Sequence, residues 1–264
     1  MIPVHKEVLS REEDVSLRAC KKELSAFDCY LVYPHGMGVK AYTDIFDKLR
    51  LQPVAPKWLS SVEQYNKMKL SMSFYLMFSS YSYLLTYELD SYIFRANFEQ
   101  VNAFAYDFIG APFFKGYLTA PSDAPFTKGC NSGFSIRNIG SCIRILRSMR
   151  KYRLQWMMHK YFFSIFPKVT FHLNRITKDH FNNVLTPKLG FYFSAADHVN
   201  EDLVWTRIVP QLFQDFRVAD HQSALQFSFE HNPERLFCLN DGRLPLGCHA
   251  WYKYRHFWKQ HIDY

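Results

Sequence analysis

Two carboxylates stand one residue apart directly after an apolar, aromatic run, because Glu88 and Asp90 follow the segment Tyr81 to Tyr87. Side chains of a strand alternate between its two faces, so a strand that continues through Asp90 would point both acids the same way. Carboxylate oxygens are the ligands that Mg²⁺ and Mn²⁺ prefer. The pair indicates a site where a divalent cation carries a diphosphate, which suits sugar transfer from a nucleotide diphosphate. The alternative is a pair of solvated acids beside a turn.

The elements that must position this pair alternate between strand and helix. The pattern predicts strands at Ile2 to Val4, Cys29 to Tyr33, Tyr81 to Tyr87 and Tyr106 to Ile109, and helices at Leu9 to Ser25 and Asn66 to Phe78. Alternation of this kind is typical of an α/β fold with a mostly parallel sheet flanked by helices. Active sites in such sheets gather at the carboxyl ends of the strands, where Glu88 and Asp90 stand.

The second half is less regular. We expect one or two basic helices within Ser135 to Lys160, a helix that begins at Asn200, a helix over Ser223 to Phe229, and no clear period from Gly242 onward. The chain has 264 residues and is 18% aromatic with 10 glycines, which favours a heavily packed globule. We predict one domain over 1–264, with a nucleotide-sugar-binding half at 1–115 and an irregular acceptor and catalytic half at 116–264.

Cysteine and charge patterns exclude several classes of protein. The six cysteines form no CxxC pair, which argues against a zinc knuckle and for reduced thiols. No signal peptide is visible at the start, and polar residues interrupt the most apolar stretch, Leu70 to Leu89, so a cytoplasmic protein is expected. The net charge of +8 is concentrated between Arg137 and Lys160, where basic and apolar residues interleave. This segment is either a solvated helix face or a surface for anionic lipid at the inner face of the membrane, and without a recognition motif it does not indicate nucleic-acid binding.

Six blocks, in their linear order, carry a resemblance that spans nearly the whole chain: Ser61 to Leu70, Tyr87 to Phe94, Tyr106 to Pro112, Asn131 to Arg137, Asn200 to Asp202 and Leu246 to Trp251. The chain resembles a largely uncharacterised family of small bacterial GT-A-like glycosyltransferases of surface-polysaccharide and lipopolysaccharide gene clusters. The resemblance implies a Rossmann-type, GT-A-like fold. It also implies transfer of one sugar, a hexose or deoxyhexose, to a lipopolysaccharide, lipid-linked oligosaccharide or other surface glycan.

The resemblance implies a set of donor-binding residues. Asp90, Glu88 and His249 would hold Mg²⁺ or Mn²⁺, although the family usually has Gln where this chain has Glu88. A neutral imidazole can be the third ligand of such an ion. The nucleotide of a donor linked to uridine or guanosine diphosphate would lie along two further groups: Pro3, His5 and Lys6 after the first strand, and Tyr65, Asn66 and Lys69 on the following helix.

The same resemblance implies how the chemistry would run. Asp202 would accept the proton of the attacking hydroxyl in an inverting reaction, and Glu201 would bind acceptor hydroxyls beside it. Read from the residues alone, Asn200 and these acids fit the first turn of a helix. Two other functions remain open, a retaining transferase and a non-catalytic glycan-binding protein with the same fold.

Acceptor-side residues are implied in three places. Asn131, Ser132 and Gly133 resemble a glycine-rich turn that lets a sugar approach the backbone, and their alternative role is a plain tight turn. Asp107 would line the pocket or merely close a strand, and Trp251 would stack on a sugar ring or pack in the core. Glu230 matches the family pattern, but no role follows for it.

Overall fold

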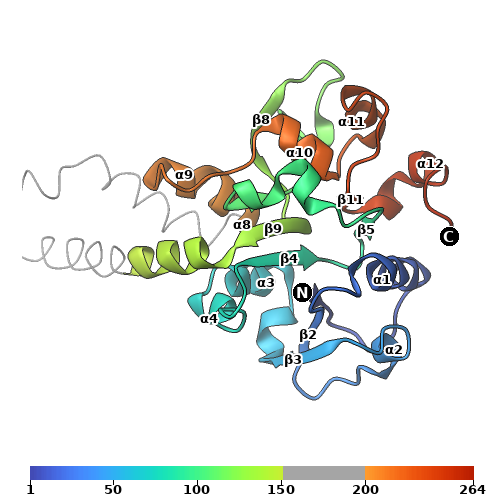
Figure 1. The fold of residues 1–264 in the computed structure, drawn as a ribbon, viewed down its shortest axis with the longest axis vertical. Coiled ribbons are helices and arrows are strands. Elements are labelled where there is room, and N and C mark those ends of the chain that lie inside the picture. The colour runs from blue at the N-terminus through green and yellow to red at the C-terminus, as the bar shows by residue number, and fades with distance from the viewer. Residues whose placement is uncertain (151–199) are drawn as a thin grey trace, which may run out of the picture.

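The computed structural model describes residues 1–150 and 200–264, and it shows a mixed α/β fold (Figure 1). Within these residues the strands form several small sheets, with helices packed around them. Figure 1 shows the amino-terminal sheet and α1 on one side of β4 and β9, and the carboxy-terminal helices on the other side. The site described below lies between these two parts of the chain.

The amino-terminal sheet has the predicted β-α-β start. Strands β1 (Ile2–Pro3), β2 (Tyr30–Pro34) and β3 (Arg50–Val54) pair in parallel in that order, with β2 in the middle. Helix α1 (Arg11–Leu24) connects β1 to β2. It begins where the sequence dictates, because Ser10 and Glu13 bond each other's backbone N–H groups in a capping box. The short helix α2 (Lys40–Thr43) lies between β2 and β3.

The second sheet is antiparallel. Strand β9 (Phe134–Asn138) lies between β4 (Tyr83–Tyr87) and β6 (Phe108–Ile109). The backbone N–H of Tyr87 donates to Met1 O at 3.0 Å, so β4 lies against β1. The expectation of one mostly parallel sheet is therefore not confirmed for the described strands. The reason is that β9 returns beside β4 in the opposite direction, which the alternation of elements in the first half does not predict.

The remaining described strands are short. Strand β11 (Gly247–Cys248) pairs in parallel with β10 (Ser228–Phe229) and antiparallel with β5 (Tyr92–Ile93), and β7 (Pro112–Phe114) pairs antiparallel with β8 (Phe126–Cys130). The helix expected over Ser223 to Phe229 is α10 (His221–Phe227), which ends where β10 begins. Side-chain pattern alone does not place that boundary, because strand pairing with β11 sets it.

Several short helices complete the description. The helix expected at Asn66 to Phe78 is two helices, which Ser71 separates by capping the second. They are α3 (Val62–Lys69) and α4 (Met72–Leu76), and the others are α8 (Glu201–Leu203), the π-helical turn Val204–Ile208, α9 (Val209–Leu212), α11 (Pro233–Leu239) and α12 (Arg255–Trp258). Short 3-10 turns are Pro56–Leu59, Phe98–Val101, Ala103–Ala105, Tyr117–Thr119 and Trp251–Tyr254. Residues 139–150 are helical.

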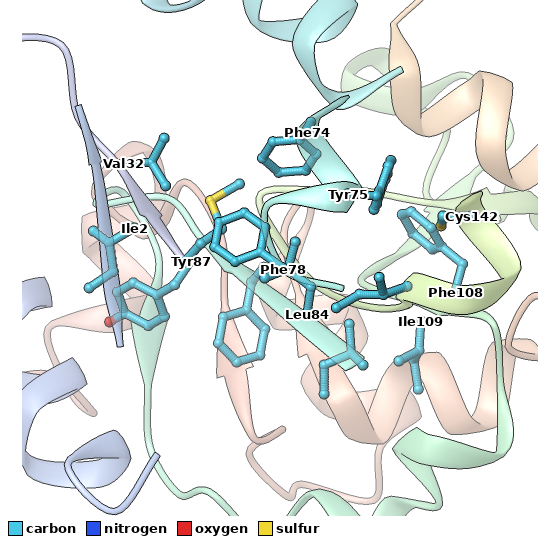
Figure 2. Close-up of a cluster of buried hydrophobic side chains, with 14 of the residues drawn as sticks. Ile2, Val32, Phe74, Tyr75, Phe78, Leu84, Tyr87, Phe108, Ile109 and Cys142 are labelled. Atoms are coloured by element: carbon cyan, nitrogen blue, oxygen red, sulfur yellow. The ribbon is translucent and has the colours of Figure 1, made fainter. Parts of the chain in front are cut away.

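The main core packs the two first sheets against α3, α4 and the helix at 139–150. Figure 2 shows Ile2 and Val32 from the first sheet near Tyr87 of β4, with Phe74 beyond them. All four side chains are almost fully buried. Each large apolar side chain removed from water contributes on the order of 1.5–3 kcal/mol to burial free energy. This core holds β4 in place, and β4 ends at the two acids.

The basic segment Arg137 to Lys160 departs from its prediction at Arg137 but matches the predicted solvated helix face at Arg144, Arg147 and Arg150, which are exposed on the helix at 139–150. Arg137 lies in β9, is fully buried and pairs with Glu201, so it belongs to the interior. Arg144 is exposed and pairs with Asp215. Residues 151–160 lie outside the described residues. None of the described helices combines the length and the apolar character that a membrane span requires. The six cysteines carry free thiols, as predicted.

Candidate functional site

A cavity of about 580 Å³ opens where β1 and β4 end. Most of the residues predicted to meet the donor line this cavity: Pro3, His5, Lys6, Tyr65, Glu88 and Asp90. The first turn of α1 and the start of α3 form other parts of its wall, through Glu12, Glu13, Ser61 and Val62. Tyr252 is the one lining residue from the carboxy-terminal part among those described. The donor half predicted from sequence thus supplies nearly the whole described wall.

Glu88, Asp90 and His249 form a cluster at this cavity. One ligand atom of each lies within 4.8 Å of the others. The His249 Nε2 atom is 3.1 Å from Asp90 Oδ1 and 3.4 Å from Glu88 Oε2. The predicted strand ends at Tyr87 as expected, so the condition that it continues through Asp90 is not met, and the N–H of Ser91 donates to Glu88 O at 2.8 Å in a turn. The turn, and not strand alternation, brings the two carboxylates together.

The pairing of β10 with β11 fixes the ring of His249. Phe229 and Cys248 are register partners, so the next residues along each strand, Glu230 and His249, are neighbours. Glu230 Oε1 lies 3.1 Å from His249 Nδ1, and the backbone N–H of His249 donates to Phe229 O at 2.8 Å. A carboxylate on one ring nitrogen is the usual arrangement for a metal-binding histidine, because it orients the other nitrogen toward the ion. Sequence alone gave Glu230 no role.

Gly133 leaves the space that the His249 ring needs. A Cβ atom at this position would lie 2.2 Å from two atoms of the ring. The side-chain oxygen of Asn131 accepts the backbone N–H of Gly133 at 2.7 Å and so closes the turn before β9. Of the two roles predicted for this segment, the tight turn is the one that these contacts describe.

The residues fit a divalent cation in donor type and in arrangement. Two carboxylates and one imidazole are ligands for Mg²⁺ or Mn²⁺. The His249 Nε2 atom is buried and has no hydrogen-bond partner among the described residues. Burial by itself lowers the pKa of His249, but the carboxylates of Asp90, Glu230 and Glu88 raise the pKa well above its usual value. A cation at this position would therefore compete with a proton on His249.

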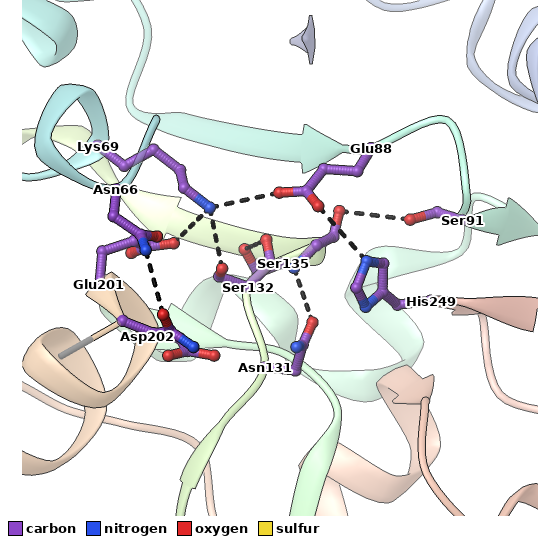
Figure 3. Close-up of polar contacts among 12 residues, drawn as sticks. Asn66, Lys69, Glu88, Ser91, Asn131, Ser132, Ser135, Glu201, Asp202 and His249 are labelled. Atoms are coloured by element: carbon purple, nitrogen blue, oxygen red, sulfur yellow. Dashed lines mark hydrogen bonds and ion pairs between the residues drawn. The ribbon is translucent and has the colours of Figure 1, made fainter. Parts of the chain in front are cut away.

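A second charged group is buried, and Figure 3 shows two of its members, Lys69 and Glu201, on the side of Glu88 opposite His249. Glu201 Oε1 is 2.6 Å from Lys69 Nζ and 2.9 Å from Arg137 Nη2. Lys69 Nζ also donates to Ser132 Oγ at 3.1 Å and lies 3.3 Å from Glu88 Oε1. Burial raises the pKa of Glu201, but Arg137 and Lys69 outweigh it, so the pKa is lowered overall. Glu201 is a carboxylate held between two cations.

Asp202 is the next residue and has a different environment. It is 7% exposed, and its Oδ1 accepts the backbone N–H of Leu203 at 2.7 Å. Burial, with the charge of Glu201 as the second cause, raises the pKa of Asp202 to about 7. Asn200 makes no capping hydrogen bond with its side chain within the described residues, and its Oδ1 accepts from Asn66 Nδ2 at 3.2 Å. Asn200 is therefore the N-cap residue of α8 with the two acids in the first turn, as the helix-cap alternative predicted, but it caps through its backbone carbonyl and not through its side chain.

Several sequence-predicted residues stand apart from the wall of the cavity. Asn66 and Lys69 are not among the residues that line the cavity, because Asn66 bonds Asn200 and the Lys69 ammonium is buried against Glu201. Asp107 also stands apart from the wall: its carboxylate accepts from Ser141 Oγ at 2.6 Å and from the backbone N–H of Arg217 at 2.8 Å. Trp251 is fully buried and packs near Tyr92 and Tyr264, so of its two predicted roles the structure has the one in the core. Asp202, Glu201 and His249 are not among the lining residues either.

Comparisons with known proteins place the chain in a family. A crystal structure of an active-site mutant of LgtC matches with a TM-score of 0.47 at 11% identity, over 94% of this chain and 86% of that one. The structure of A197 from STIV matches with a TM-score of 0.29 at 12% identity, over 55% of this chain and 65% of that one. Neither TM-score establishes a shared fold. No curated protein matches the sequence. Residues 48–249 match the family described as "Protein of unknown function (DUF5672)", and the chain belongs to that family.

Proposed function

We propose that the protein is a cation-dependent glycosyltransferase that moves one sugar from a nucleotide diphosphate to a glycan acceptor with inversion. The observation that carries this proposal is the cluster of Glu88, Asp90 and His249 beside a cavity of about 580 Å³. Cavities of this size hold a small molecule such as a nucleotide. An oxygen-rich cation site at the inner wall of such a cavity is what a diphosphate requires.

The charge of the cavity wall supports a cation-bound donor. Four carboxylates line it, from Glu12, Glu13, Glu88 and Asp90. The one lysine of the described wall, Lys6, pairs with Glu13 at 2.7 Å. A diphosphate would be repelled by this wall unless a divalent cation compensated its charge. When bound, Mg²⁺ or Mn²⁺ would neutralise charge on the departing nucleotide. Asp90, Glu88 and His249 would hold the ion, and Glu230 would keep the ring of His249 oriented.

The base is the second part of the proposal. Asp202 has a pKa of about 7, so a useful fraction is ionised and able to accept a proton near neutral pH. It is one residue from Glu201, which Lys69 connects to the cation cluster. General-base catalysis of this kind is typically worth ~10²–10⁴ in rate. Because Glu201 is already bound to two cations, we assign it the task of holding this region together and not that of binding acceptor hydroxyls.

The acceptor and the place of action are further parts of the proposal. We propose a hexose or deoxyhexose linked to uridine or guanosine diphosphate as the donor, and a lipopolysaccharide or lipid-linked surface glycan as the acceptor, at the cytoplasmic face of the membrane. Residues 1–115 would bind the donor and 116–264 would meet the acceptor. Arg137 no longer supports a lipid-binding surface, because it is buried. Any such surface would rest on the basic residues that follow it.

A donor panel tests the function. Purified protein is incubated with uridine- and guanosine-linked sugars, with Mn²⁺, with Mg²⁺ or with a chelator, and nucleotide release is measured. We expect release from one donor class, loss with the chelator, and loss in Asp90→Asn. Asp47→Asn is the matched control, since Asp47 is an exposed acid that pairs with Lys21 and does not line the cavity. Release that ignores both chelator and Asp90→Asn would contradict the proposal, and the proton NMR coupling at the new anomeric centre separates inversion from retention.

A further inference from the structure

Lys69 is buried between the cation cluster and the acids of α8. Its side chain is 3% exposed, and its ammonium carries three hydrogen atoms for three partners. Those partners are Glu201 Oε1 at 2.6 Å, Ser132 Oγ at 3.1 Å and Glu88 Oε1 at 3.3 Å. The ring of Tyr65, which lines the cavity, lies against the ammonium at 4.1 Å. The Lys69 ammonium is thus surrounded by side chains of this protein.

Lys69 and His249 contact different oxygens of the Glu88 carboxylate. Oε1 faces Lys69 at 3.3 Å, and Oε2 faces His249 Nε2 at 3.4 Å. Glu88 is only partly buried, with 24% of its side chain exposed, so burial alone does not fix its rotamer. Lys69 is the fixed group in this pair, because Glu201 holds it at the shorter distance and Arg137 holds Glu201 in turn.

We propose that Lys69 is a positioning residue that orients Glu88 toward the cation site and connects that site to the buried pair of Glu201 and Arg137. The proposal rests on the proposed function for the cation, and it adds a residue that does not touch the donor. Lys69 leaves one oxygen of Glu88 free for the ion by occupying the other.

Two physical effects of removing Lys69 have opposite signs. Loss of a nearby positive charge would strengthen binding of a cation through Coulomb's law. Loss of an outer partner of a metal ligand typically weakens metal binding by ~10–100-fold, because the ligand is no longer oriented. Since Lys69 has its charge compensated by Glu201, we expect orientation to outweigh repulsion. The sign of the change in affinity therefore decides between a positioning role and a mere neighbouring charge.

The experiment is a Mn²⁺ titration of the full chain by electron paramagnetic resonance, with no donor present. Lys69→Met removes the charge and keeps the length of the side chain. We expect its dissociation constant for Mn²⁺ to rise about tenfold or more. Lys69→Arg keeps a cation that can reach both carboxylates, and we expect it to recover most of the lost affinity. Lys67→Met is the matched control, because Lys67 lies on the same helix, is 44% exposed and pairs with Glu63, and it should bind Mn²⁺ as the wild type does.

The outcomes separate this inference from the proposed function. Unchanged or tighter Mn²⁺ binding in Lys69→Met, with normal binding in the wild type, would overturn the positioning role and leave the transferase proposal intact. A wild type that binds no Mn²⁺ would overturn both. If Lys69→Met does not fold, Lys69→Gln replaces it, because its side chain is uncharged and one bond shorter, so Glu88 loses the contact at 3.3 Å, and equal affinity in that folded variant would count against the proposal in the same way.

Discussion

The protein contains two groups of charged residues, one around Glu201 and one around His249. Glu88 contacts both groups, which differ in how far their charges are compensated within the protein. Around Glu201, two cations, Lys69 and Arg137, face one carboxylate oxygen inside the protein, so the charge of the acid is compensated without any ligand, although Glu201 Oε2 and Arg137 Nε have no hydrogen-bond partner in the described part of the chain. Around His249, three carboxylates converge on one ring, and its Nε2 has no hydrogen-bond partner in the described part of the chain. Buried charges are tolerated when they are paired, so the first group stabilises the fold and the second is suited to an added cation. Compensation, and not the number of charges, distinguishes a structural cluster from a binding site.

The largest expected effect is the loss of stability when the group around Glu201 is disrupted. Glu201→Gln leaves Lys69 and Arg137 with one anion fewer in the interior, and breaking a buried pair typically lowers the free energy of unfolding by ~3–5 kcal/mol. Glu63→Gln is the control, because Glu63 is exposed and its pair with Lys67 should contribute less than about 1 kcal/mol. Urea unfolding followed by circular dichroism measures both. Equal losses in the two variants would show that the buried group is no more stabilising than a surface pair.

Asp202 should control both rate and pH dependence. Since burial and Glu201 raise the pKa of Asp202 to about 7, activity should rise as the pH increases through that value and the base ionises. Asp202→Asn should lower the rate by ~10²–10⁴-fold above that pKa, and by less at lower pH, where the wild-type base is itself protonated. Both expectations are checked by measuring nucleotide release at saturating donor and acceptor from about pH 5.5 to about 8.5. This range spans the pH at which groups with a pKa near neutrality titrate. A variant that keeps the wild-type profile would remove Asp202 from the mechanism.

The same pKa has a consequence for stability. An Asp with a raised pKa in the folded state stays protonated there while it ionises in the unfolded state, so the free energy of unfolding falls as the pH rises from the normal pKa toward about 7. Asp202→Asn lacks this contribution. We expect the stability difference, variant minus wild type, to increase over that pH range and to level off above it. A difference that is constant with pH would contradict the raised pKa.

Cation binding by the group around His249 should depend on the space around the ring as well as on charge. Gly133→Ala places a methyl group 2.2 Å from the His249 ring, which must move away from Glu88 and Asp90. We expect Mn²⁺ affinity to fall by ~100-fold, the upper end of the range for displaced metal partners. Gly140→Ala is the control, because its added carbon would meet Asn138 Oδ1 at 3.4 Å, an ordinary contact. Calorimetric titration with Mn²⁺ measures both, and equal affinities would show that His249 is not a ligand.

The smallest expected effect is at Glu230. Glu230→Gln keeps an acceptor for His249 Nδ1 but removes the charge that raises the basicity of the ring. We expect Mn²⁺ affinity to fall about tenfold, near the lower end for such partners. Glu234→Gln is the control, since Glu234 lies at the surface and pairs with His256. A fall in Mn²⁺ affinity of the same size in both variants would mean that Glu230 acts only through the net charge of the protein and not through its contact with His249.

Local sequence predicted the elements of the first half and the location of the acids, but not the reason why the acids meet. The pattern from Tyr81 to Tyr87 correctly placed a strand before Glu88, whereas the turn that joins Glu88 to Asp90 depends on a hydrogen bond from Ser91. The partnership of Glu230 with His249 depends on strand register between distant segments. Such register is a tertiary property, and no spacing along the chain encodes it.

Burial was the second quantity that the sequence did not reveal. Arg137 and Lys69 stand in segments rich in basic residues, where solvated side chains are the default, and Glu201 stands in the first turn of a helix. Only the packing of β9, α3 and α8 against one another shows that these three charges compensate each other in the interior. The prediction of an exposed basic surface failed at Arg137 for this reason, whereas Arg144, Arg147 and Arg150 are exposed as predicted. Trp251 similarly became a core residue because the carboxy-terminal helices cover it.

The most direct test of the central claim is a crystal of the protein soaked with Mn²⁺ and a nucleoside diphosphate, with anomalous diffraction recorded at the manganese edge. The account predicts an anomalous peak in contact with Glu88, Asp90 and His249, with diphosphate oxygens on the side of the cavity. A peak at any other place, or a diphosphate bound with no manganese between those three side chains, would contradict it.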